Sequence, residues 1–128
     1  MQEKNNPLSP HLQIYRWQIS SLLSITHRIV GVINILAISA ICFWSLFLLL
    51  GAESYEVLNN FFNSFFGKFI AVGLCWTFSF HILNELRHLF WDMGYGFDLK
   101  ISRITGVLAL VGSFVLTIIF YLIGKNFI

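Results

Sequence analysis

The sequence predicts an all-α membrane protein with three transmembrane helices, and three features of the chain predict it. Hydrophobic residues make up 57% of the 128 residues and charged residues only 11%, about half the charged fraction of a typical soluble domain. The mean hydropathy is +0.76. Three stretches, 29–50, 69–84 and 104–124, contain no charged residue. Since roughly 20 apolar residues cross the hydrocarbon core of a bilayer, each stretch with its flanks is long enough for a spanning helix.

We expect the whole chain, 1–128, to form one transmembrane domain. Residues 1–20 are mixed in polarity and partly aromatic, which is typical of a segment lying along the inner membrane surface. Pro7 and Pro10 keep its start extended. The three helices are expected near 21–50, 63–90 and 103–126.

The basic residues predict the orientation of these helices. Six fall on one side of the membrane, namely Lys4, Arg16, Arg28, Arg87, Lys100 and Arg103. Lys68 and Lys125 fall on the other side, together with Glu53 and Glu56 in the loop after the first helix. The positive-inside rule then predicts an N-in, C-out topology. The start of the chain resembles neither an apolar signal sequence nor an Arg-rich transit peptide. We therefore expect a bacterial inner-membrane protein, or a mitochondrial one encoded in the organelle.

Ionisable residues near the end of the second predicted helix are the first candidates for chemistry. His81 follows the uncharged run 69–80, and an ionisable group at membrane depth is a functional hypothesis by default. His88 comes seven residues later, so the two histidines share a helix face about 10 Å apart along the axis. Together with Arg87 they suit a haem, with an imidazole for iron and basic groups for the propionates. A buried histidine bonded to a backbone carbonyl is the alternative interpretation.

A second polar group opens the first predicted helix, where Ser24, His27 and Arg28 occur together. Ser24 and Arg28 are four residues apart and therefore lie on one helix face. A hydroxyl beside a guanidinium suits a quinone carbonyl or a haem propionate. Alternatively, Arg28 is a topology anchor that reaches lipid phosphates. Cys42 and Cys75 lie in apolar runs without metal-binding spacing, so we interpret them as buried apolar residues.

Three motifs together make the chain resemble the cytochrome b subunit of succinate dehydrogenase, a membrane anchor of respiratory complex II. They are Pro7-Leu8-Ser9-Pro10-His11-Leu12-Gln13-Ile14-Tyr15, Ser24-Ile25-Thr26-His27-Arg28, and His81 followed by Arg87-His88-Leu89-Phe90-Trp91-Asp92-Met93-Gly94-Tyr95. The resemblance covers nearly the whole chain. It implies packing against a second three-helix subunit, anchoring of the flavoprotein and iron–sulfur subunits, one haem b shared with the partner subunit, and part of a ubiquinone site.

The same resemblance implies roles for individual residues. His81 matches the axial haem ligand and is therefore the expected metal-binding residue, while the partner subunit supplies the other axial histidine. His27 and Arg28 match positions near the haem propionates. Ser24 and Arg28 match residues of the ubiquinone site. His88 matches a second histidine near the inner end. The chain has no flavin fingerprint, so no catalysis is expected from it alone. Membrane lipid is a further expected partner, and nucleic acid is not.

Glu85 departs from the family pattern, which usually has glycine at this position. It lies one helical turn after His81 on the same face. A glycine there lets a flat ring approach the backbone, whereas a carboxylate obstructs it or pairs with Arg87, His88 or a partner cation. Glu85 therefore favours one alternative, a haem-free structural anchor of this complex or of a fumarate reductase. A proton or ion transporter subunit that relays protons through Glu85, His81 and His88 is the other.

Overall fold

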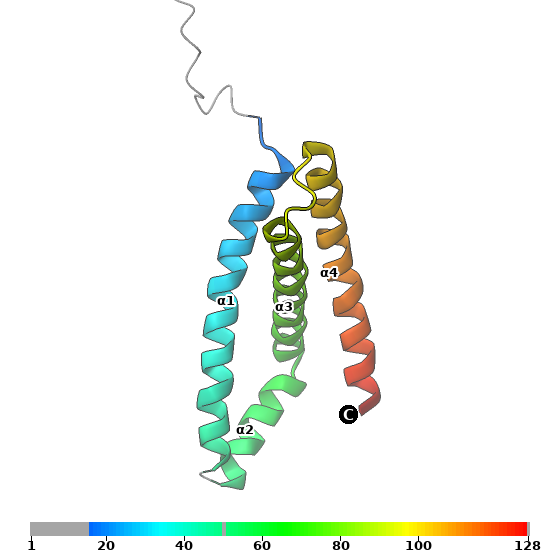
Figure 1. The fold of residues 1–128 in the computed structure, drawn as a ribbon. Coiled ribbons are helices and arrows are strands. Elements are labelled where there is room, and N and C mark those ends of the chain that lie inside the picture. Colours follow the sequence, from blue (N-terminus) through cyan, green and yellow to red (C-terminus); the bar gives the residue numbers. More distant parts are fainter. Residues whose placement is uncertain (1–15, 50, 128) are drawn as a thin grey trace, which may run out of the picture.

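The computed structural model describes residues 16–49 and 51–127, and within these ranges the chain forms four helices and no strand (Figure 1). The helices are α1 (Ile19–Leu48), α2 (Ala52–Asn63), α3 (Phe65–Asp92) and α4 (Leu99–Phe127). The motif that begins at Pro7 lies outside the described residues. So does most of the predicted interfacial segment 1–20, whose last two residues already belong to α1.

Three of the four helices are long and apolar enough to cross a membrane, namely α1, α3 and the part of α4 from Leu99 to Lys125. The predictions of an all-α fold and of three spanning helices are therefore confirmed. The predicted limits near 21–50, 63–90 and 103–126 compare with Ile19–Leu48, Phe65–Asp92 and Leu99–Phe127.

The short helix α2 corrects the prediction of a loop between the first two spans. It begins after Gly51, whose φ of 130° breaks the chain away from α1. Glu53 lies in its first turn, where a negative charge is favoured by the helix dipole. The helix has polar and aromatic faces but too few apolar residues to span a bilayer. Its sequence therefore lacks the long apolar run that predicts a spanning helix.

Ser64 makes the sharp corner between α2 and α3. Its extended backbone ends one helix and begins the next, and its hydroxyl accepts a hydrogen bond from the Gly67 N–H at 3.1 Å. This is the N-cap contact that serines typically make. Gly67 is buried against the end of α2, and a Cβ on it would overlap the backbone carbonyl of Phe61. The corner therefore requires glycine at this position.

Replacement of Gly67 by alanine is expected to destabilise the corner by about 1–3 kcal/mol, because the added methyl group meets backbone rather than a flexible side chain. The measurement is the thermal midpoint of the detergent-solubilised protein. Gly73→Ala is the matched control, since a Cβ at Gly73 meets nothing within 4 Å among the described residues. Equal midpoints for the two variants would contradict this account of the corner.

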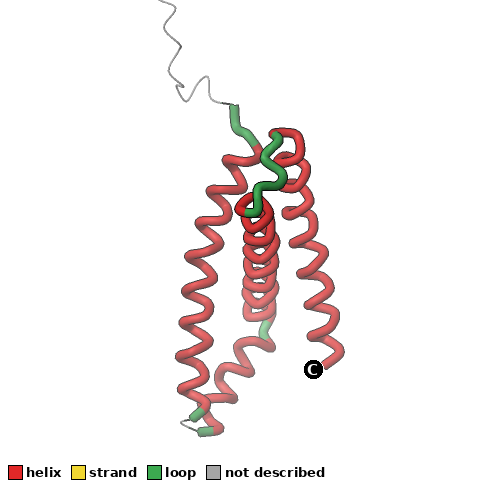
Figure 2. The backbone as a smooth tube through the Cα atoms, viewed as in Figure 1, coloured by secondary structure: helices red, strands yellow, loops and turns green. Residues whose placement is uncertain are grey.

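Helix α3 lies between α1 and α4 (Figures 1 and 2). The beginning of α1, the end of α3 and the beginning of α4 meet at one end of the bundle, and α2 lies at the other. Small residues let α4 approach its neighbours: Gly106 lies against Leu23 of α1, and Gly112 lies against Leu83 of α3. Close approach at small residues is how helices associate in membranes, where lipid removes the hydrophobic driving force.

The interior combines a small apolar cluster with polar contacts. Leu23 and Val30 of α1 pack with Phe80 of α3. Further along, the Thr77 hydroxyl donates to Asn34 Oδ1 at 2.8 Å, and Asn34 Nδ2 donates to the Thr77 carbonyl at 3.4 Å. Interhelical hydrogen bonds of this kind contribute about 0.6 kcal/mol each in membranes, so they fix the register of α1 on α3 more than they add stability.

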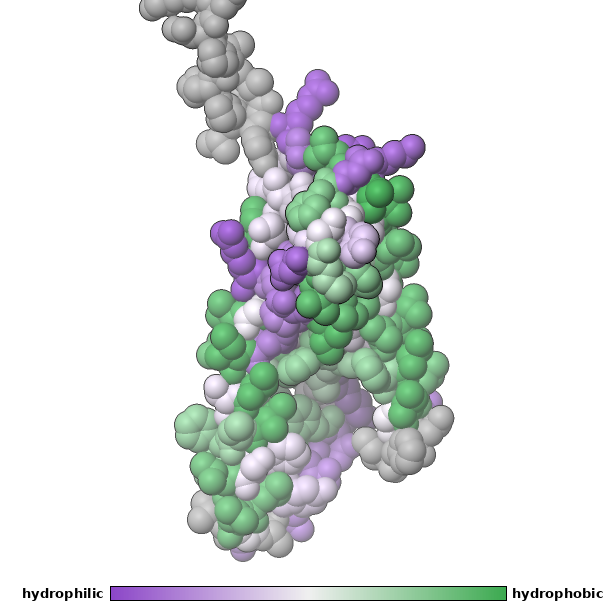
Figure 3. Space-filling model, viewed as in Figure 1, coloured by the Kyte–Doolittle hydropathy of each residue, from purple (hydrophilic) through white to green (hydrophobic). Residues whose placement is uncertain are grey.

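Most of the apolar surface of the three spanning helices is left uncovered by the part of the chain that the structure describes. In the three spanning helices only 17–22% of the most apolar window is buried. Hydrophobic side chains cover the body of the molecule, and hydrophilic ones gather at the end where α1 and α4 begin and continue inward between α1 and α3 (Figure 3). The long apolar faces are therefore available to lipid or to other helices.

Candidate functional site

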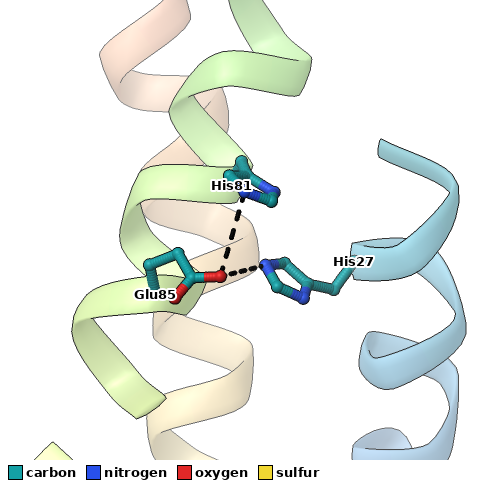
Figure 4. A group of neighbouring side chains, drawn as sticks. All are labelled: His27, His81 and Glu85. Carbon is teal, nitrogen blue, oxygen red and sulfur yellow. Dashed lines mark ion pairs between the residues drawn. The ribbon is translucent and has the colours of Figure 1, made fainter. Parts of the chain in front are cut away.

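Helices α1 and α3 bring His27, His81 and Glu85 together between them (Figure 4). His81 and Glu85 are one turn apart on α3, and His27 comes from α1. Glu85 Oε1 lies 3.1 Å from His27 Nε2 and 3.8 Å from His81 Nε2. The two imidazole rings stack, with centroids 4.4 Å apart and planes inclined by 14°. The register that the helix contacts impose thus pairs two histidines that are far apart in sequence.

His88 extends this group toward the end of α3. Its ring meets His27 edge-on at a centroid distance of 5.3 Å, and it also lies 5.3 Å from the ring of Trp91. His27 is thus in contact with both histidines that the sequence places two turns apart on α3. We name His27, His81 and His88 the histidine cluster.

Two nitrogen atoms of this cluster are buried without a hydrogen-bond partner, His81 Nδ1 and His27 Nε2. His27 Nε2 is close to Glu85 Oε1, yet their orientation is not that of a hydrogen bond. Buried polar atoms are nearly always paired, so these two nitrogen atoms are exceptions among the described residues. Because His81 Nδ1 is enclosed, Nε2 is the His81 nitrogen that faces outward, toward Glu85.

The sequence grouped Arg87 with His81 and His88 as a basic group for a haem, but the structure places its side chain against α4. Its guanidinium is buried against α4, where it donates to the Ser102 carbonyl at 3.0 Å, the Ser102 hydroxyl at 2.9 Å and the Thr105 hydroxyl at 3.2 Å. It also stacks over Trp91, 4.1 Å from the ring centroid. Its bonds therefore tie α3 to the beginning of α4. The spacing of four residues between Arg87 and Trp91 is the sequence feature from which the stacking of these two side chains could be predicted.

A groove of about 440 Å³ opens beside the histidine cluster. Its lining residues come from the beginning of α1 and the end of α3, namely Ser20, Ser21, Ser24, Ile25, Asn84, Arg87, His88 and Trp91. Ser24, predicted as a quinone-site residue, lines it. Arg28 is exposed on α1, one turn from Ser24, and does not line the groove. Asn84, buried with its Nδ2 unpaired, is a polar lining residue that the sequence did not single out.

The polar groups of the site therefore lie at one end of the bundle. The groove and the histidine cluster share His88, and the apolar cluster of Leu23, Val30 and Phe80 packs next to both. An imidazole next to a groove with hydroxyl and amide groups can hold a metal centre beside a small polar ligand.

The family model of the succinate dehydrogenase/fumarate reductase transmembrane subunit matches residues 2–120. The chain belongs to this family. The succinate dehydrogenase cytochrome b556 subunit of Rickettsia felis is 42% identical over 115 residues, which are 90% of each chain. That of Paracoccus denitrificans is 33% identical over 115 residues, covering 90% of this chain and 88% of the relative. The cytochrome b560 subunit of Reclinomonas americana is 36% identical over 127 residues, covering 93% and 86%.

The predicted resemblance to succinate dehydrogenase subunits is thereby confirmed. With three spanning helices and this family, the chain is a multi-pass inner-membrane subunit of the complex II type. Family membership also places it in an oxidoreductase complex, which does not favour the proton or ion transporter alternative.

Proposed function

We propose that this subunit anchors a succinate:ubiquinone oxidoreductase, helps bind one haem b and forms part of the ubiquinone-reduction site. The observation that carries the proposal is the convergence of the histidine cluster with the groove that Ser24 lines. The family and its cytochrome-named relatives support it. We propose further that the chain performs no catalysis alone, because the flavoprotein subunit oxidises succinate.

For the haem, His81 is the proposed axial ligand. Its imidazole fits, because Nδ1 is enclosed while Nε2 faces outward, toward Glu85. The second axial histidine would come from the partner subunit. His27, stacked on His81, and the exposed Arg28 next to it in sequence are the proposed propionate partners. His88 contacts His27 and is the weaker candidate. A bound haem supplies one-electron transfer.

For ubiquinone, the proposed binding place is the groove beside the cluster. The Ser24 hydroxyl would donate to a quinone oxygen. Arg28 is exposed one turn further along the helix and does not line the groove, so its side chain would turn toward the bound quinone to stabilise the negative charge that develops on that oxygen during reduction. Trp91 and Ile25 give the groove apolar walls that suit a quinone ring. The buried Arg87 contributes a positive charge to the same wall.

The proposed orientation is N-in, C-out, which places the groove at the inner membrane edge. This follows from Arg16, Arg28 and Arg103 at the same end of the bundle as the groove. The iron–sulfur subunit would dock there together with the flavoprotein subunit. A second three-helix subunit would cover part of the uncovered apolar surface, and membrane lipid the rest.

The test is a reduced-minus-oxidised visible spectrum of the complex purified through this subunit. We expect a b-type absorption corresponding to one haem per copy. Absence of the band in a complex that still reduces ubiquinone with succinate would establish the haem-free anchor instead. A complex that reduces fumarate but does not reduce ubiquinone with succinate would assign the subunit to a fumarate reductase.

A further inference from the structure

Glu85 occupies the place on the histidine cluster where a metal ion would approach the imidazole nitrogens. A single carboxylate oxygen, Oε1, faces Nε2 of His27 at 3.1 Å and Nε2 of His81 at 3.8 Å. Among the described residues these two imidazoles are the only ion-pair partners of Glu85. The nearby cation Arg87 is engaged with α4 and does not compete for the carboxylate.

The carboxylate and a haem cannot both occupy this position, although a bare metal ion could lie between Glu85 and the two histidines. Metal–imidazole bonds are about 2.0–2.1 Å long, and the flat ring around a haem iron needs clear space beyond that. Since Nδ1 of His81 is enclosed, the haem iron must approach Nε2 of His81, which is the atom that Glu85 faces. The Glu85 side chain is 54% exposed and has rotatable bonds, so it is free to turn away when the position is taken.

We infer that Glu85 controls haem binding by competing with the haem iron for Nε2 of His81, so that its carboxylate must leave both imidazoles before haem binds. The inference rests on the proposed haem function. In this proposal Glu85 regulates the binding of the haem iron to His81 and is not itself an iron ligand. The contact of the carboxylate with His27 links α1 to α3.

The experiment is a haemin titration of the whole complex, purified from cells that cannot make haem and followed by the Soret absorbance. Wild type is compared with Glu85→Gln, which keeps the size and removes the charge, and with Glu85→Gly, which removes the side chain. Both variants are expected to bind haemin about tenfold more tightly than wild type. Glu56→Gln on α2, exposed at the far end of the bundle, is the matched control with unchanged affinity.

Three outcomes are distinguishable. Tighter binding by Glu85→Gln and Glu85→Gly, with the control equal to wild type, supports the competition. Saturation at one haemin per complex with equal or weaker affinity in both Glu85 variants overturns it and leaves the haem proposal standing. If no form binds haemin, including Glu85→Gly, both the competition and the haem proposal are rejected.

Discussion

Replacement of His81 by alanine is expected to abolish the b-type haem absorption of the complex. The imidazole is the proposed iron ligand, so its removal takes away the bond through which this subunit holds the iron. Loss of a ligand that joins two subunits also removes a link between their helices, so the complex is expected to dissociate more readily. The measurement is haem per complex from the reduced-minus-oxidised spectrum, with retention of the other subunits followed by gel filtration.

Thr77→Val is the matched control for this experiment. It lies one turn before His81 on α3, and it removes the hydrogen bond to Asn34 while preserving the shape of the side chain. It should therefore keep the full band with at most a small loss of stability. A normal band in His81→Ala would reject His81 as the ligand. Alanine variants of His27 and His88 would then identify the histidine that binds iron.

Much of the site follows from spacing within single helices. His81, Glu85 and His88 share a face of α3 because a helix repeats every 3.6 residues, and Ser24 and Arg28 are related in the same way on α1. The three spans follow from long apolar runs that only a membrane accommodates. These features are local, so sequence alone is sufficient to predict them.

The contacts between helices could not be read from spacing. The stacking of His27 on His81 depends on the register of α1 against α3, which the packing of Leu23, Val30 and Phe80 and the hydrogen bonds between Asn34 and Thr77 determine together. The pairing of Glu85 with His27 depends on the same register. Sequence reasoning proposed Arg87, His88 or a partner cation for Glu85, and the structure places Arg87 against α4 instead.

The corner at Ser64 and the helix before it were missed for a different reason. Helix α2 is amphipathic and short, so the long apolar window that finds spanning helices does not detect it. Ser64 and Gly67 form a capping pair only because the chain turns there. The turn itself depends on α2 packing against α1 and α3, which involves residues distant in sequence.

Replacement of Arg28 by leucine is expected to lower the rate of ubiquinone reduction by about 10²-fold, the range observed when one preorganised donor is removed from a site that stabilises developing charge. Succinate oxidation measured with an artificial dye should remain near the wild-type rate, because that reaction takes place on the flavoprotein subunit. Ser24→Ala should act in the same direction, since its hydroxyl lines the groove.

Arg103→Leu is the matched control for charge. Arg103 is exposed near the beginning of α4, at the same end of the bundle, and unlike Arg28 it does not belong to the helix that carries Ser24. If Arg28 acted only as a topology anchor for lipid phosphates, the two leucine variants would reduce ubiquinone equally well. If it stabilises the reacting quinone, only Arg28→Leu loses quinone reduction while dye-linked activity and the amount of assembled complex stay unchanged. The ratio of the two activities thus separates a role in binding quinone from a role in membrane insertion, because a poorly inserted complex loses both activities together.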